Sequence, residues 1–385
     1  IKLKGKQGNL QGIGANIRVK NGDTEQFHYH SLSRGYKSSV DPVVHFGLGK
    51  AAQAETLQVT WPDGREQVLT AVPANQVLEL RYADATAPKK ESTNETGKNR
   101  LFASANQQMA IDYIHREEDY ADFKVQPLIP HKHSQNGPGL AAGDINGDGL
   151  DDFYVGAGVG FTGRFFMQQA NGTFVQRPLQ GACERCEDTG ALLFDADQDG
   201  DLDLYLASGS TEFYKGAENY TDRLYLNNGQ GDFTHAPDAL PPHRESSFAV
   251  KAADFDTDGD LDLFVGSRVV PGSYPLPPKS FIYRNDGGRF TDVTETVAPG
   301  LSETGMVSDA LWTDFNNDGQ TDLVMVGEFM APVFYRNNGG SFTDVSAETG
   351  LGEYYGWWNS LAAGDFDSDG DIDYVAGNLG LNSLY

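Results

Sequence analysis

The stretch Asp254-Phe-Asp-Thr-Asp-Gly-Asp-Leu-Asp262 is an acidic loop that runs directly into the apolar segment Leu263-Phe-Val-Gly266. Carboxylates occupy positions 1, 3, 5 and 9 of the loop, and Gly259 occupies position 6. This spacing lets a nine-residue loop wrap oxygen ligands around a hard cation, and the glycine permits the sharp turn that points them inward. The stretch therefore predicts a calcium-binding turn that leads into a buried strand.

The same arrangement occurs five times, and the loop starts are 51, 59, 60 and 51 residues apart. The last acidic ligand is at position 9, whereas an EF-hand has a glutamate at position 12, so these loops are not EF-hands. The residue at position 7 contributes its backbone carbonyl. We expect about five Ca²⁺ ions, and Mg²⁺ is the weaker alternative because it keeps its waters. The predicted ligands of loops one to five, in chain order, are Asp144, Asn146, Asp148, Leu150 and Asp152; Asp195, Asp197, Asp199, Asp201 and Asp203; Asp254, Asp256, Asp258, Asp260 and Asp262; Asp314, Asn316, Asp318, Gln320 and Asp322; and Asp365, Asp367, Asp369, Asp371 and Asp373.

A turn that binds nothing is the alternative for any single loop, because Asp and Gly are common in turns. Five position-matched loops weigh against it. Two carboxylates about 4 Å apart repel by about 4 kcal/mol at an effective dielectric constant of about 20, so several on one tight turn need a cation. Asn146 and Asn316 replace Asp at position 3, and we expect those two sites to be weaker.

Composition limits the function further. The 385 residues carry a formal net charge of -26, which makes nucleic acid and anionic membranes poor partners. No apolar run reaches the roughly 18 residues of a membrane span. The two cysteines, Cys183 and Cys186, predict a small disulfide in an oxidising compartment; a zinc half-site, a redox pair and free thiols are the alternatives. We expect a secreted, periplasmic or cell-surface protein.

The first 82 residues contain no acidic loop and read as short strands separated by turn signals. Gly12-Ile-Gly-Ala, His45-Phe-Gly-Leu-Gly and Trp61-Pro-Asp-Gly resemble the ASPIC/UnbV domain. That resemblance implies a small all-β domain that commonly accompanies calcium-loop repeats in secreted proteins, and it carries no defined activity. Residues 83–100 are polar and predict a linker.

Residues 101–385 form the predicted repeat region. After each acidic loop and strand comes a hairpin signature, such as Phe281-Ile-Tyr-Arg-Asn-Asp-Gly-Gly-Arg-Phe290, which gives about four strands per repeat. This pattern resembles the FG-GAP/VCBS repeat family, which includes integrin-type propellers and the cartilage acidic protein family. The resemblance implies an all-β fold, a β-propeller of four-stranded blades with calcium loops. Four repeats are complete and the fifth is partial. Because the resemblance implies more repeats in such proteins, we expect a fragment of a larger ring, with residues 101–130 as an alternative source of outer strands for the fifth blade.

For function we favour a binding or adhesion module for a glycan or protein partner. The insertions at residues 209–220, 271–278 and 354–359 carry Tyr and Trp that suit such a partner, although Trp357 and Trp358 also fit a blade core. The alternative is a polysaccharide lyase or hydrolase. No GxSxG, HExxH or phosphate-cradling loop is present, so we assign no catalytic or cofactor-binding residue. His131 and His133 have metal-pair spacing, but a plain loop is favoured because no third ligand is nearby in sequence.

Overall fold

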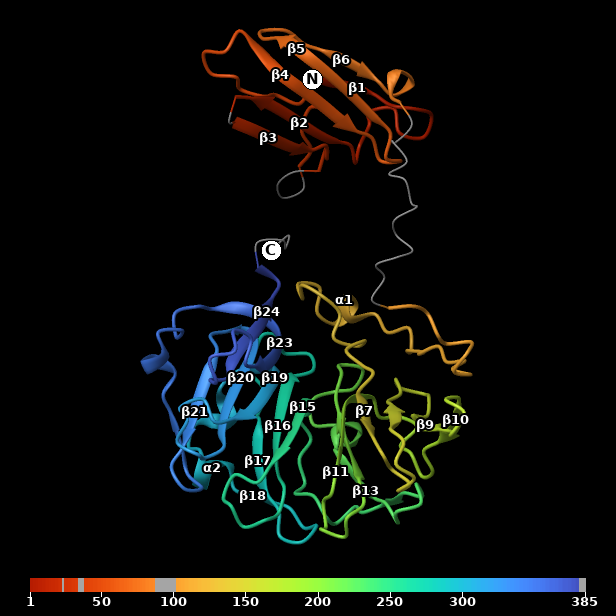
Figure 1. The fold of residues 1–385 in the computed structure, drawn as a ribbon, viewed down its shortest axis with the longest axis vertical. Coiled ribbons are helices and arrows are strands. Elements are labelled where there is room, and N and C mark those ends of the chain that lie inside the picture. Colours follow the sequence, from red (N-terminus) through yellow and green to blue (C-terminus); the bar gives the residue numbers. More distant parts are fainter. Residues whose placement is uncertain (23, 34–37, 87–101, 381–385) are drawn as a thin grey trace. The chain divides into compact units, whose positions relative to one another are not determined.

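The structure is a computed structural model that describes residues 1–22, 24–33, 38–86 and 102–380. It is all-β and contains two compact units, Ile1–Ser104 and Ala105–Tyr385 (Figure 1). Most of the predicted linker, from residue 87 to residue 100, lies outside the described residues. We therefore describe each unit by itself.

The N-terminal unit packs an antiparallel sheet and a parallel strand pair around one apolar core. Burial alternates along β2, where Ile17 and Val19 face the core, as expected for a sheet with one solvated face. The core also holds Trp61 and reaches Ala85, while Thr86 bridges to Glu66. The sheet order is β3 (Thr24–Tyr29), β2 (Asn16–Asn21), β4 (Gln53–Thr60), β5 (Glu66–Pro73), and the pair is β1 (Lys2–Lys4) with β6 (Glu79–Arg81), followed by η1 (Tyr82–Asp84).

The repeat unit consists of successive antiparallel sheets in which each strand pairs with the next one along the chain (Figure 1). In each sheet the first two strands are joined by an acidic loop, and the last two by a hairpin turn. The strands are β7 (Leu140–Gly143), β8 (Asp152–Val155), β9 (Arg164–Gln168) and β10 (Phe174–Pro178); β11 (Asp188–Phe194), β12 (Asp203–Ser208), β13 (Arg223–Leu226) and β14 (Thr234–His235); β15 (Ser246–Ala253), β16 (Asp262–Val269), β17 (Phe281–Arg284) and β18 (Thr291–Asp292); and β19 (Met306–Thr313), β20 (Asp322–Met330), β21 (Val333–Asn337) and β22 (Phe342–Asp344).

The apolar cores lie between neighbouring sheets. One cluster joins Tyr154 and Phe165 of the first sheet to Leu204 of the second, and further clusters join the second sheet to the third and the third to the fourth. Strands β12 and β16 are consequently buried along their whole length. Stacked four-stranded sheets with cores on both faces are the packing of propeller blades, so the predicted propeller-like fold is confirmed.

The fifth repeat contributes β23 (Gly356–Gly364) and β24 (Asp373–Asn378), which pair with each other. Strand β20 extends past the residues that pair with β21 and pairs with β23 through Glu328 and Trp357, while Glu328 also pairs with Met306 of β19. Residues 109–113, one alternative source of outer strands for the fifth repeat, pack instead against the first sheet, where the Phe174 N–H donates to the Met109 carbonyl.

Short helices complete the described part of this unit. They lie in connections between strands and not within the sheets, so none of them interrupts a blade. They are α1 (Asp122–Val125), η2 (Glu218–Tyr220), α2 (Thr294–Val297), η3 (Leu301–Glu303) and η4 (Ser346–Thr349).

Candidate metal centres

Each predicted metal loop forms the turn between the first and second strands of its sheet. Loop one connects β7 to β8, loop two connects β11 to β12, loop three connects β15 to β16, loop four connects β19 to β20, and loop five connects β23 to β24. In every loop the aspartate at position 9 is the first residue of the second strand. The strand pairing therefore holds the two ends of the loop together, so positions 1 and 9 lie close together where the loop joins the strands.

The turns share one backbone geometry. The glycine at position 6 has a φ between 82° and 100° in all five loops, a left-handed conformation that favours glycine. Its N–H donates to the Oδ2 of the position 1 aspartate, at 3.1 Å from Gly259 to Asp254 and 2.7 Å from Gly319 to Asp314. Position 4 is left-handed as well, including the β-branched Thr257 at 62°, where a side chain costs energy. The loop shape is thus built to gather the odd-numbered side chains.

The aspartate at position 9 connects the loop to the blade. Asp262 is buried; its Oδ2 accepts the Phe255 N–H at 3.2 Å and its Oδ1 accepts the Asn285 N–H at 2.8 Å. Burial is the main cause that raises the pKa of Asp262 to about 7 and the pKa of Asp203 to about 6. A divalent cation would favour the ionised form of these carboxyl groups.

The loops divide into two classes by what their side-chain oxygens contact. In loops one, four and five the position 5 N–H donates to the oxygens at positions 1 and 3, as from Asp318 to Asp314 (3.0 Å) and to Asn316 (2.9 Å). In loops two and three one buried oxygen at each of positions 1 and 3 has no hydrogen-bond partner; these are the Oδ1 atoms of Asp195, Asp197, Asp254 and Asp256. Unpaired buried carboxylate oxygens are costly and fit a cation.

Three loops bring three carboxylates within metal-binding distance of one another. The described residues contain three such acidic groups, and in each a set of ligand oxygens lies within 4.8 Å. Loops one and four, which carry Asn at position 3, are not among them. The side chain of Asp260 at position 7 instead accepts the Gly287 N–H at 3.0 Å, which leaves its backbone carbonyl for a metal. The three groups are Asp195, Asp197 and Asp199; Asp254, Asp256 and Asp262; and Asp365, Asp367 and Asp373.

Sequence reasoning treated the hairpin asparagines as turn residues and missed their role. Asn285 is buried, and its Nδ2 donates to the carbonyl of Ala196 in the preceding blade (2.8 Å) and to Leu261 in its own (3.1 Å). Asn227 and Asn337 make the equivalent bonds. These asparagines tie loops one, two and three each to the blade that follows. The signal was available, because an Asn recurs at the same hairpin position in three repeats.

A further group lies away from the acidic loops. His131 and His133, for which the sequence favoured a plain loop, lie beside Glu328, which is 197 residues from His131. Burial lowers the pKa of His133 to about 4. Burial alone would raise the pKa of Glu328, but the hydrogen bond from His131 and the charge of Arg268 outweigh it and lower that pKa to about 2. The expectation that these histidines lack a third partner is therefore wrong, since Glu328 is distant only in sequence.

The predicted disulfide between Cys183 and Cys186 is present, with the two Cα atoms 5.4 Å apart. Within the described residues, no helix has the length and apolar character needed to cross a bilayer.

The fold and the turns define an all-β repeat protein with acidic loops at equivalent strand junctions. A small β domain precedes the repeats in the sequence. Residues 5–87 match the ASPIC and UnbV family, and residues 144–206, 195–265 and 314–376 match the FG-GAP-like repeat. The chain therefore carries an ASPIC and UnbV domain and FG-GAP-like repeats.

Curated relatives share parts of the chain. Cartilage acidic protein 1 of Mus musculus is 28% identical over 214 residues, which cover 53% of this chain and 31% of the relative. Cartilage acidic protein 1 of Homo sapiens is 35% identical over 82 residues, which cover 21% of this chain and 10% of the relative. The chain thus spans less than a third of the length of these relatives. The crystal structure of Saccharomyces cerevisiae Sqt1 aligns over 58% of this chain and 52% of its own, with 13% identity and a TM-score of 0.36, too low to support an argument.

Proposed function

We propose that the repeat region is a calcium-stabilised propeller that serves as an extracellular binding module for a protein or glycan partner. The observation that carries the metal part is the set of buried, unpaired Oδ1 atoms in loops two and three. The FG-GAP-like repeats, the acidic groups within 4.8 Å and the raised pKa values of the position 9 aspartates support it.

In each loop the ion would be held by the side chains at positions 1, 3, 5 and 9 and by the carbonyl at position 7. All of these are oxygen ligands, which Ca²⁺ takes in sets of about six to eight, while Mg²⁺ keeps several waters. Because position 1 follows the first strand and position 9 begins the second, the ion would fasten the two inner strands of a blade together.

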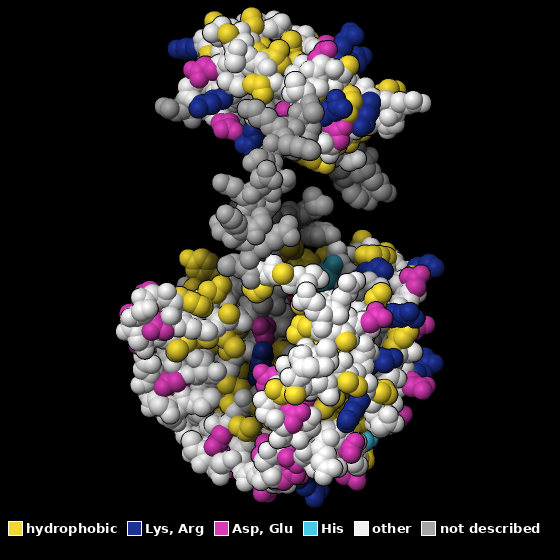
Figure 2. Space-filling model, turned by 45° about the vertical axis from the view of Figure 1, so that its right-hand side comes forward, with side chains coloured by type: hydrophobic (Ala, Val, Ile, Leu, Met, Phe, Trp, Pro, Cys, Tyr) yellow, Lys and Arg dark blue, Asp and Glu magenta, His cyan; other side chains and the backbone are white. Residues whose placement is uncertain are grey.

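The partner surface is proposed at the other end of the blades. The insertions at residues 209–220 and 271–278 follow the second strands β12 and β16, whereas the acidic loops precede those strands. Tyr214, Tyr354 and Tyr355 are exposed, and Tyr is enriched in protein interfaces. Figure 2 shows a hollow in the face of the repeat unit, the lower body, with hydrophobic side chains on its walls and charged ones on its floor.

The extracellular location is supported by the Cys183–Cys186 disulfide, because disulfides persist in oxidising compartments.

Metal analysis of the dialysed full chain in millimolar calcium tests the metal part. We expect about five Ca²⁺ ions per chain, and fewer in the double variant Asp195→Asn, Asp254→Asn, which removes a ligand charge from loops two and three. Asp84→Asn, an exposed acid of the N-terminal unit, is the matched control and should bind as the wild type. Fewer than two ions in the wild type would contradict the proposal.

Binding of the labelled full chain to an array of matrix polysaccharides and proteins tests the partner part. We expect calcium-dependent retention that is lost in Tyr354→Ala, Tyr355→Ala and kept in Phe27→Ala, an exposed aromatic of the N-terminal unit. Retention that is unchanged in the double tyrosine variant would place the partner surface elsewhere.

A further inference from the structure

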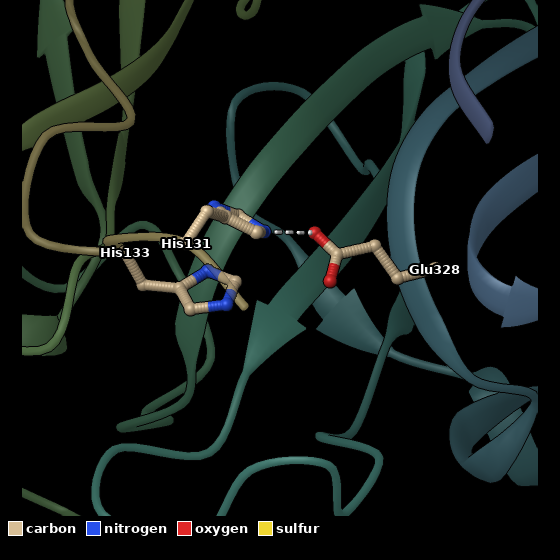
Figure 3. A group of neighbouring side chains, drawn as sticks. All are labelled: His131, His133 and Glu328. Atoms are coloured by element: carbon tan, nitrogen blue, oxygen red, sulfur yellow. Dashed lines mark hydrogen bonds and ion pairs between the residues drawn. The ribbon is translucent and has the colours of Figure 1, made fainter. Parts of the chain in front are cut away.

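His131, His133 and Glu328 form a compact cluster of nitrogen and oxygen ligands outside the acidic loops. One ligand atom from each of the three side chains lies within 4.8 Å of the other two. The two imidazole rings are tilted by 48° with centroids 4.2 Å apart, and the Glu328 carboxylate faces them (Figure 3). His133 and Glu328 are each only 1% exposed. Two histidines and one carboxylate are a donor set that holds zinc and iron in proteins.

The segment that carries the histidines is held by hydrogen bonds to a buried carboxylate. Asp122, in α1, accepts the backbone N–H groups of His133 (3.0 Å) and Ser134 (3.1 Å) through Oδ1. The Thr211 hydroxyl donates to the same oxygen at 2.9 Å. Glu328 is held in turn by the pairing of β20 with β23. Hydrogen bonds to Asp122 and the pairing of β20 with β23 thus fix the backbone that carries the three side chains.

The hydrogen bonds of His131 determine where its proton lies. Its Nδ1 is 2.9 Å from the Lys132 carbonyl, so Nδ1 carries the proton and donates. The Nε2 lone pair then faces Glu328 Oε1 at 3.1 Å. Either a second proton or a metal ion must lie at this nitrogen. A backbone carbonyl that accepts from Nδ1 is also the usual partner behind a metal-bound histidine.

His133 decides between these two explanations. Its Nε2 is buried and has no hydrogen-bond partner. Its Nδ1 is 3.4 Å from the Asn136 side-chain amide, and the Nε2 lone pair is available to a metal when that amide turns its oxygen toward Nδ1 and accepts the Nδ1 proton. A charged His131 would satisfy Glu328 but would leave the nitrogen of His133 unpaired. A metal ion between the rings and the carboxylate accounts for both, because it accepts a lone pair from each imidazole.

Arg268 and Tyr274 position the carboxylate. The Arg268 Nε and Nη2 donate to Glu328 Oε1 at 3.2 and 2.9 Å, and the Tyr274 hydroxyl donates to Oε2 at 3.1 Å. The guanidinium repels a cation, but it contacts Oε1 and leaves Oε2 with a free lone pair. Such outer contacts orient a ligating carboxylate.

We propose that His131, His133 and Glu328 bind one first-row divalent transition-metal ion, for which Zn²⁺ is the probe. The two nitrogen donors distinguish this site from the acidic loops, which offer only oxygen and suit Ca²⁺. Three protein ligands leave a position open for water or an anionic group of a partner beside Arg268. The site does not depend on calcium in the loops, so each proposal can fail without the other.

Zinc titration of the full chain in saturating calcium, against a chromophoric competitor, tests the proposal. We expect one zinc ion per chain that millimolar calcium does not displace. His131→Gln and His133→Gln should each weaken the affinity by at least about 100-fold, as loss of one of three ligands removes more than an outer-shell change. His45→Gln, an exposed histidine of the N-terminal unit, should bind as the wild type. Absence of stoichiometric zinc, or equal affinity in the His131 variant, overturns the proposal.

Two measurements on the wild type keep the test independent of whether the variants fold. Cobalt added in place of zinc should give visible d–d absorption of low-symmetry nitrogen–oxygen coordination, and zinc should abolish it. Zinc should also protect His131, whose side chain is 33% exposed, from acylation by diethyl pyrocarbonate, while His45 stays reactive. Acylation of His131 at the same rate with and without zinc overturns the proposal.

Discussion

The two units of this chain are both all-β, yet their apolar cores are built differently. The N-terminal unit closes a single apolar core around Trp61 and contains no acidic turn. The repeat unit stacks its sheets so that β12 and β16 are buried on both faces, but it leaves carboxylate oxygens unpaired at the strand junctions. The comparison teaches that burial completes the core of the first unit, whereas the second unit has buried carboxylate oxygens for which we propose a bound cation.

The largest effects expected of a single substitution come from the cores, and these variants also show whether the two units unfold separately. Trp61→Ala in the N-terminal unit and Phe264→Ala in the repeat unit should each lower the free energy of unfolding of their own unit by about 3–5 kcal/mol. Differential scanning calorimetry in calcium should show, for each variant, a lower melting temperature for the mutated unit and an unchanged melting temperature for the other unit. Val68→Ala and Val175→Ala, both exposed valines, are the matched controls and should change stability by less than about 0.5 kcal/mol. A single transition that moves in both core variants would break the comparison.

An intermediate effect comes from Glu187, a buried acid of the repeat unit. Burial first, and then the charges of Glu212 and Glu117, raise the pKa of Glu187 to about 9. A carboxyl group whose pKa is raised in the folded state contributes its full stability below its pKa in the unfolded state. This contribution is lost as the pH rises through its pKa in the folded state. The free energy of unfolding of the repeat unit in saturating calcium should therefore fall from about pH 6 to about pH 8, by at most about 1.4 kcal/mol per pH unit.

Chemical denaturation across that pH range, for the wild type and for Glu187→Gln, measures this slope. The variant cannot ionise and should lose the slope, while the N-terminal unit keeps its own pH dependence in both proteins. An identical slope in the wild type and the variant would show that Glu187 is not the titrating group.

The smallest expected effect is within the repeat unit, between the loops that carry Asp at position 3 and the loops that carry Asn there. Asp256→Asn gives loop three the position 3 residue of loops one and four, and Asn146→Asp does the reverse in loop one. We expect calcium affinity to fall about tenfold in the first variant and to rise in the second, about 1.4 kcal/mol in each direction. Calorimetric titration resolves the change. No change in either variant would mean that the carboxylate at position 3 does not set the affinity.

Much of this architecture could be predicted from the sequence because its signals are local. The five acidic loops, the strands that follow them and the hairpins repeat at fixed positions within each repeat, and the structure places every loop at the same strand junction. The Cys183–Cys186 disulfide was also predicted, since the sequence has no second cysteine pair to complete a zinc site and no βαβ pattern around a redox pair.

Contacts between distant residues could not be predicted in the same way. The bond from Asn285 to Ala196 depends on how neighbouring blades stack, and the approach of Glu328 to His131 joins residues 197 apart. The division of the loops into two classes depends on whether the position 5 N–H reaches the side chains of positions 1 and 3, a matter of backbone orientation that residue identity does not fix.

The central claim is that calcium completes the repeat unit and not the N-terminal unit. Extracellular calcium sites have dissociation constants of roughly 10⁻⁴ to 10⁻³ M, and at about ten times that concentration each site adds about 1.4 kcal/mol, or about 7 kcal/mol for five. The most direct measurement is calorimetry of the full chain in calcium and in excess chelator. The account predicts that chelator lowers the repeat transition by many degrees and leaves the N-terminal transition in place. Two transitions that both stay put, with metal removal confirmed, would contradict it.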